Sequence, residues 1–161
     1  MILESLAATV PCADCAGEAA WQGVQALVGD SLRWDTEVVC RDCGSAMAIC
    51  GGELPAPLRE RMLAEHGRTV LRLEEAPGAP VAPGVRVAVM RVLRTALGVP
   101  LADVRDVLER VLSGEYGGTL PETEWLARRL RAAGVGAVAV RVGDGCARTD
   151  EFSSPPGSWL P

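Results

Sequence analysis

Lysine is absent from this chain of 161 residues, so all 16 basic residues are arginines. This absence excludes Schiff-base chemistry, which needs a lysine amine. There is one histidine, His66, so any Ser/His/Asp catalytic triad would have to use it. The sequence also contains no glycine-rich phosphate-binding loop. A lone histidine at a predicted helix end is more typical of a structural side chain. We therefore expect a protein that is not an enzyme.

Aromatic residues and long apolar runs are also scarce. The chain has one Tyr and one Phe, and no apolar run approaches the ~20 residues that a membrane helix needs. It begins M-I-L-E, with an acid where a signal peptide needs positive charge. Hydrophobic residues make up 48% of the chain and charged residues 23%, as in folded proteins. We expect a cytoplasmic protein with no membrane partner.

Charge is divided unevenly along the chain. Residues 1–67 contain four arginines and ten acidic residues, whereas residues 85–142 contain nine arginines and six acidic residues. Proteins that bind nucleic acid use clustered cations and stacking aromatic side chains. An acidic first half in a chain with one Tyr and one Phe therefore disfavours nucleic acid as the partner.

Cysteines, in contrast, form a clear pattern of two C-x-x-C pairs, separated by 24 residues. Each pair can turn two thiolates toward one cation, and two pairs complete a tetrahedral four-sulfur shell with no open position. The intervening residues can form a β-hairpin. The pattern predicts a structural zinc ion, Zn2+, with four ligands: Cys12, Cys15, Cys40 and Cys43.

A redox-active pair and two disulfides are the alternatives to zinc. A redox C-x-x-C lies at a helix start after a buried strand and needs no second pair, and disulfides require an exported chain, so both fit less well. Cys50 could replace one ligand, although a small buried thiol is the better interpretation. Gly17 and Gly44 are expected to let amides turn toward the sulfurs. Cys146 is expected to be a free surface thiol in a tail.

The sequence of the first half predicts a β-hairpin and a short helix. Strand-like runs at residues 21–28 and 32–39 flank a turn at G-D, and they place Trp21 and Trp34 in a small core. Residues 57–66 are predicted to be helical, with an apolar stripe of Leu58, Met62 and Leu63. Residues 74–84 are rich in Pro and Gly, which is typical of a linker or long loop.

From Val85 the pattern becomes regularly helical. One helix is predicted to end at Gly98, a second to begin near Pro100, and a third to open with the capping box T-L-P-E and end at Gly134. Residues 137–142 alternate like an edge strand. The core face of the first helix is assigned to Ala88, Val89, Val92, Leu93 and Ala96, and the second helix is marked by Leu101, Val104, Leu108 and Val111. Three acids are interpreted as solvated: Glu115, Glu122 and Glu124.

The opposite face of the first helix combines apolar and cationic side chains. Four residues lie at i, i+3, i+4 and i+7 on this face: Val87, Met90, Arg91 and Arg94. A solvated helix face could contain the same residues. Methionine and arginine are also favoured at protein interfaces, which indicates a binding surface.

The run R-V-A-V-M-R-V-L-R-T-A-L-G-V-P-L-A-D-V-R-D-V-L resembles the C-terminal domain of the bacterial ribosomal stalk protein of the large subunit. The resemblance covers residues 68–142. It implies a first strand at residues 69–74 and three helices on a three-stranded sheet. In that family a basic and apolar surface of the first two helices contacts translational GTPases. The matching residues here are Val87, Met90, Arg91, Arg94 and Arg105.

The chain departs from the family in three ways, of which the first is a longer, proline-rich loop between the first strand and the first helix. An acidic zinc ribbon stands where the stalk protein has its N-terminal anchoring segment, so this chain is not expected to be the stalk itself. Pro100 should stiffen the turn between the two helices. We expect an α+β protein with a zinc ribbon and trailing helix at residues 1–67, a small stalk-type α/β sandwich at residues 68–142, and a disordered tail at residues 143–161.

The expected function is that of a non-enzymatic zinc-binding adaptor. Its protein partner would present acidic and apolar surface to the arginine-bearing helix face, and the resemblance implies a translational GTPase. A second hypothesis is an immunity or regulatory protein that neutralises another protein, such as a toxin. A third is a zinc ribbon that docks on nucleic acid or RNA polymerase.

Overall fold

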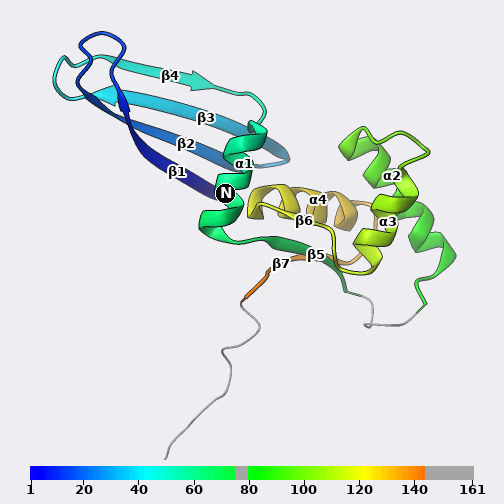
Figure 1. Ribbon diagram of the computed structural model, residues 1–161. Helices are drawn as coiled ribbons and strands as arrows, with labels where there is room; N and C mark the ends of the chain where they lie inside the picture. The colour runs from blue at the N-terminus through cyan, green and yellow to red at the C-terminus, as the bar shows by residue number, and fades with distance from the viewer. Residues whose placement is uncertain (75–79, 144–161) are drawn as a thin grey trace, which may run out of the picture.

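The computed structural model describes residues 1–74 and 80–143, which form two antiparallel sheets and four helices in an α+β arrangement (Figure 1). The first sheet has the strand order β1 (Ile2–Pro11), β2 (Glu18–Val28), β3 (Ser31–Cys40) and β4 (Ala46–Cys50). The second has the order β6 (Gly117–Gly118), β5 (Thr69–Leu73) and β7 (Ala137–Arg141). The helices are α1 (Ala56–His66), α2 (Pro83–Leu97), α3 (Val104–Leu112) and α4 (Leu120–Ala132).

The first sheet is a meander built around the predicted hairpin. β2 and β3 pair from Ala19 opposite Cys40 to Val28 opposite Ser31, so the turn falls on G-D as the sequence indicates. Trp34 is buried and Trp21 half-buried, and their ring centroids lie 6.4 Å apart. Both rings cover Gly23, where a Cβ atom would lie 2.3 Å from the Trp34 ring. The tryptophans therefore belong to a small core, as predicted.

The strands β1 and β4 were not predicted, because neither has a clear alternating pattern. β1 directs Glu4 inward as well as Leu6. All five residues of β4 are exposed. Cys50 ends β4, and the expectation that it is a buried thiol is wrong because it lies on an edge strand whose five residues are all exposed.

Helix α1 and the second half largely follow the sequence pattern. Met62 of α1 is fully buried against Leu6 and Trp34. The strand β5 and the edge strand β7 form at the expected positions. In α2, Val89 and Leu93 are fully buried, while Ala88, Val92 and Ala96 pack around them in the larger core. Residues 75–79 of the predicted linker, and residues 144–161 of the predicted tail with Cys146, lie outside the described residues.

Helix α3 begins later than expected, and this changes the role of Leu101. The amides of Asp103 and Val104 both donate to the Pro100 carbonyl, so a turn precedes the helix. Leu101 lies in this turn and is 68% exposed, which makes its assignment to the helix wrong. Val104, Leu108 and Val111 lie on the helix as predicted, and all three are buried.

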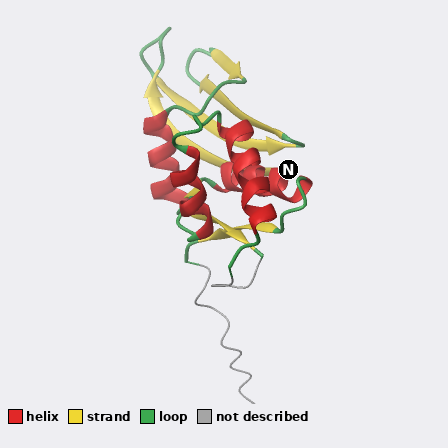
Figure 2. Ribbon diagram, turned by 90° about the vertical axis from the view of Figure 1, so that its right-hand side faces the viewer, coloured by secondary structure: helices red, strands yellow, loops and turns green. Residues whose placement is uncertain are grey.

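Helix α4 contacts both sheets (Figure 1), and the helices lie between the two sheets (Figure 2). Its predicted capping box is formed: the Thr119 side chain accepts from the Glu122 amide, and the Glu122 carboxylate accepts from the Thr119 amide. Trp125 Nε1 donates to the carbonyl of Asp30 at 3.1 Å, and Arg128 Nη1 to that of Gly29 at 2.8 Å. The β2–β3 turn is therefore held on α4 through its main-chain oxygens.

Polar side chains join the two sheets where α4 begins. Glu122 accepts two-pronged hydrogen bonds from Arg59 of α1, at 2.9 and 2.7 Å, and this pairing raises the pKa of Arg59. Buried Gln25 of β2 accepts from the Thr119 hydroxyl at 2.5 Å. Buried Glu4 of β1 pairs with Arg141 of β7 at 2.8 Å. These pairs link residues far apart in the sequence.

The interpretation of Glu122 and Glu124 as solvated acids is therefore wrong. Glu122 is shared by Arg59 and the capping box, and Glu124 accepts from both Arg128 and Arg131. Glu115 is exposed, as expected. Among the described residues, no helix is both long enough and apolar enough to cross a membrane.

Candidate metal centre and arginine-bearing helix face

The two C-x-x-C pairs lie in two loops with the same backbone pattern, which we call the knuckles (residues 12–17 and 40–45). In the first, the Cys12 amide donates to the Gly17 carbonyl and the Ala16 amide to the Cys12 carbonyl. In the second, Cys40 bonds in the same way to Ser45 and Gly44. One knuckle joins β1 to β2 and the other joins β3 to β4, at the same end of the sheet (Figure 1).

Each knuckle requires one residue in the left-handed region. This residue is Gly44 in the second knuckle, with φ of 74°, but Ala16 in the first, with φ of 60°. Gly17 has a different role from the one expected, because a Cβ atom there would lie 2.4 Å from Asp42 Oδ2 of the other knuckle. Gly17 therefore lets the two knuckles approach each other.

The pairing of β2 with β3 brings the four cysteine sulfurs together. All four lie within 4.8 Å of one another, and Cys12 Sγ to Cys43 Sγ and Cys15 Sγ to Cys40 Sγ measure 3.7 and 3.6 Å. A tetrahedron with metal–sulfur bonds of ~2.3 Å has edges of about 3.8 Å. Cys12 and Cys40 are buried, while Cys15 and Cys43 are exposed. The four cysteines are therefore close enough to coordinate one metal ion.

The electrostatics of the cluster also favour a bound cation. The amides of Cys15 and Asp14 face the sulfur of Cys12 and lower its pKa to about 7. The Gly17 amide acts in the same direction on Cys15, but the neighbouring sulfurs of Cys40 and Cys43 raise its pKa to about 12. Four sulfurs this close cannot all be negatively charged unless a cation lies among them.

The other candidate ligands lie away from the cluster or are otherwise engaged. Cys50 is not part of the four-sulfur group and ends β4 at the opposite end from the second knuckle. His66 Nε2 donates to the carbonyl of Ser5 at 2.7 Å, so the imidazole has a structural partner, as the sequence indicated.

The predicted arginine-bearing residues lie together on α2 and α3. Val87 is 50% exposed, Arg91 and Arg94 are exposed, and Met90 is half-buried. No described carboxylate lies within ion-pair distance of these two arginines or of Arg105 on α3. We call this surface the arginine face, and its members are Val87, Met90, Arg91, Arg94, Leu101 and Arg105.

Leu101 is the member of the arginine face that sequence reasoning missed. One pocket of about 430 Å³ is lined by Val87, Met90, Arg91 and Arg94 together with Leu101, and an adjoining pocket of about 390 Å³ by Met90, Leu101 and Arg105. Pro100 is the residue from which the exposure of Leu101 could have been predicted. A proline can start a turn before the helix and so direct the next residue outward.

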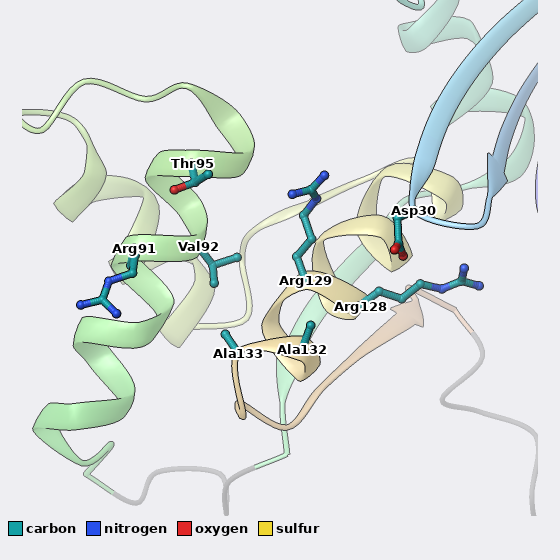
Figure 3. A pocket seen from close by; sticks show the side chains of 8 residues that line it. All are labelled: Asp30, Arg91, Val92, Thr95, Arg128, Arg129, Ala132 and Ala133. Carbon is teal, nitrogen blue, oxygen red and sulfur yellow. The ribbon is translucent and has the colours of Figure 1, made fainter.

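A third pocket, of about 420 Å³, lies between α2, α4 and the β2–β3 turn (Figure 3). Arg91, Arg128 and Arg129 border it, but their guanidinium groups point in different directions. Arg128 is bonded to the Gly29 carbonyl, and Arg129 lies over the Trp125 ring at 4.5 Å. These arginines therefore do not converge on a common ligand.

No protein-family model, curated protein or solved structure matches this chain. Its function is therefore inferred from the geometry of the metal centre and of the arginine face.

Proposed function

We propose that this chain is a non-enzymatic, zinc-binding adaptor that captures a protein partner on its arginine face. The observation that supports the capture most directly is the exposure of Val87 and Leu101 beside three arginines that have no carboxylate partner among the described residues. Arginine can pair with carboxylates in a planar, two-pronged geometry, and a half-buried methionine can adapt to an apolar side chain. Such a surface suits a partner with acidic and apolar side chains.

Zinc is the proposed metal because four thiolates in a tetrahedron favour Zn2+ over the harder cations. Iron can occupy similar four-sulfur sites. A closed shell leaves no position for a substrate, so the ion would serve structure and not catalysis. It would fix the two knuckles relative to each other and with them the ends of β1, β2, β3 and β4.

Metal analysis tests this assignment. We expect one zinc ion per chain in protein prepared under reducing conditions, and no iron-dependent visible absorption. Cys43→Ser should lose the ion, because three thiolates leave the shell incomplete. Cys50→Ser is the matched control and should retain one ion per chain. Zinc loss in the Cys50 variant, or iron in the wild type, would contradict the assignment.

The order of elements supports a translational GTPase as the class of partner. From β5 to β7 the chain runs strand, helix, helix, strand, helix, strand, with β5 in the centre of a three-stranded sheet. This order agrees with the resemblance to the stalk-protein domain. The partner class rests on that resemblance, whereas the chemistry of the surface rests on the residues themselves.

Charge reversal tests the adaptor function. The double variant Arg91→Glu, Arg94→Glu should lose about 2 kcal/mol or more of binding free energy toward purified translational GTPases, measured by calorimetry, while its melting temperature stays nearly unchanged. Arg33→Glu with Arg72→Glu is a matched control, because both side chains are exposed and lie on strands away from the arginine face. Equal binding by both double variants would contradict the proposal.

Salt dependence separates this function from nucleic-acid binding. Binding to a nucleic-acid duplex should weaken steeply with added salt in proportion to the phosphates contacted. Binding to a protein through mixed apolar and charged contacts should weaken less.

A further inference from the structure

We propose that β4 is the pairing surface between two copies of this chain, which join edge to edge into one continuous antiparallel sheet. β4 ends the strand order β1-β2-β3-β4, so β3 occupies one of its sides. Within the described residues, no second strand pairs with its other side. A free strand edge presents unpaired N–H and C=O groups, which readily pair with another strand.

The opposite edge of the same sheet is protected. On β1, the carbonyl of Ser5 accepts a hydrogen bond from His66 at 2.7 Å, and that of Ala7 accepts one from Arg61 at 2.6 Å. Both donors belong to α1, which packs along β1. The two edges therefore differ: side chains of α1 bond two carbonyls of β1, whereas none of the described side chains bonds the backbone of β4.

The side chains of β4 favour pairing as well. Its sequence, A-M-A-I-C, contains no charged residue and no proline. Charged residues and proline are the residues that usually prevent an edge strand from pairing with another chain. Met47 is 59% exposed and Ile49 58% exposed. The strand register places Met47 opposite Val38, which in turn lies opposite Trp21, so an apolar face continues from the core out to this edge.

A second copy of the chain is the occupant that fits this edge. Antiparallel pairing about a two-fold axis at Ala48 sets Met47 of each copy opposite Ile49 of the other, which buries both exposed side chains. In this register Glu53, which is exposed beyond the end of β4, lies opposite Cys43 of the other copy, beside the knuckle that contains exposed Arg41 and Asp42.

The proposed dimer would depend on the metal centre, because Cys40 and Cys43 fix the loop that leads into β4. It would not depend on the arginine face, which lies on α2 and α3. Pairing at β4 would leave one arginine face free on each copy.

Sedimentation of the full, metal-loaded chain tests the pairing. We expect a concentration-dependent dimer in the wild type. Ile49→Lys should raise the dimer dissociation constant about tenfold or more, because an apolar contact is lost twice across the two-fold axis. Leu3→Lys on the protected edge is the matched control: Leu3 is 48% exposed, and its substitution should leave the constant unchanged. A monomeric wild type, or equal weakening by both variants, would overturn the proposal and leave the edge to a strand of another protein.

A cross-link tests the register without relying on the folding of the lysine variant. The two-fold axis places the Cα atoms of Ala48 in the two copies ~4.5–5.5 Å apart, which a disulfide can span. Ala48→Cys, in a background with Cys50→Ser and Cys146→Ser, should give a covalent dimer when diamide removes two electrons and two protons from the paired thiols. Leu3→Cys in the same background should remain monomeric under these conditions. A failure of Ala48→Cys to cross-link while zinc content stays at one per chain would overturn the two-fold register.

Discussion

Ala16 and Gly44 occupy equivalent positions in the two knuckles, and both have the left-handed backbone. For a residue with a Cβ atom this conformation costs ~1–2 kcal/mol, whereas glycine adopts it freely. The first knuckle therefore contains a strained residue that the second avoids. The sequence pattern does not reveal this strain. Each cysteine pair is followed by a glycine, but the glycine comes second after the first pair (A-G) and first after the second pair (G-S).

Ala16→Gly should therefore stabilise the protein. The relief of strain is partly offset by the greater freedom of glycine in the unfolded chain, so we expect a net gain of about 0.5–1 kcal/mol. Urea unfolding of the metal-loaded protein measures this change.

Gly44→Ala is the reciprocal control and should lose about 1 kcal/mol or more, because it introduces the same strain into the second knuckle. A loss of stability in Ala16→Gly would contradict the explanation.

At the scale of the elements, the start of α4 is the point where the two sheets meet. The hydroxyl of Thr119 does two things there: it accepts from the Glu122 amide as the helix cap, and it donates to buried Gln25 of β2. The capping box could be predicted from T-L-P-E, but the bond to β2 could not, because Gln25 lies 94 positions away.

Thr119→Val should destabilise the protein by about 2–4 kcal/mol. The loss of a cap costs ~1 kcal/mol, and leaving the Gln25 oxygen buried without a donor costs a further ~1–3 kcal/mol. Thr119→Ser keeps the hydroxyl and should cost much less. Denaturant unfolding distinguishes them, and equal losses in the two variants would show that the hydroxyl has no special role.

The elements that sequence predicted are those that local patterns specify. Helical periodicity locates α2 and α4, and alternation locates the β2–β3 hairpin and β7. β1 escapes prediction because its inward Glu4 is compensated by Arg141, which lies 137 positions away. β4 has no buried residue to create a pattern, and α3 starts late because the Pro100 turn precedes it. The metal cluster was predictable because spacing alone identifies its ligands, whereas Leu101 was missed because its exposure depends on that turn.

For the whole molecule, the metal centre and the arginine face lie at opposite ends (Figure 1). The knuckle end has a small cluster of Cys12, Ala19 and Cys40. The helical half has a much larger core that extends from Leu71 to Ala137. Structural zinc contributes ~10–16 kcal/mol of binding free energy in small domains, so the knuckle end should depend on the ion far more than the helical half does.

Removal of the metal by a chelator should therefore unfold the molecule unevenly. We expect amide protection from hydrogen exchange to be lost in β3 and β4 but retained in α2, α3 and β5. Hydrogen exchange followed by peptide mass spectrometry measures each element separately. Simultaneous loss of protection in all elements would show that the two halves unfold as one unit, coupled by the polar residues that join the sheets.

The contact between α4 and the β2–β3 turn has a consequence for sequence change. Trp125 and Arg128 bind the carbonyls of Asp30 and Gly29 and not their side chains. The turn is thus recognised by its backbone shape, so position 30 is free to vary without loss of docking. Related or engineered chains could replace this turn with any other of the same length and backbone conformation, which makes it a natural place to graft a foreign peptide.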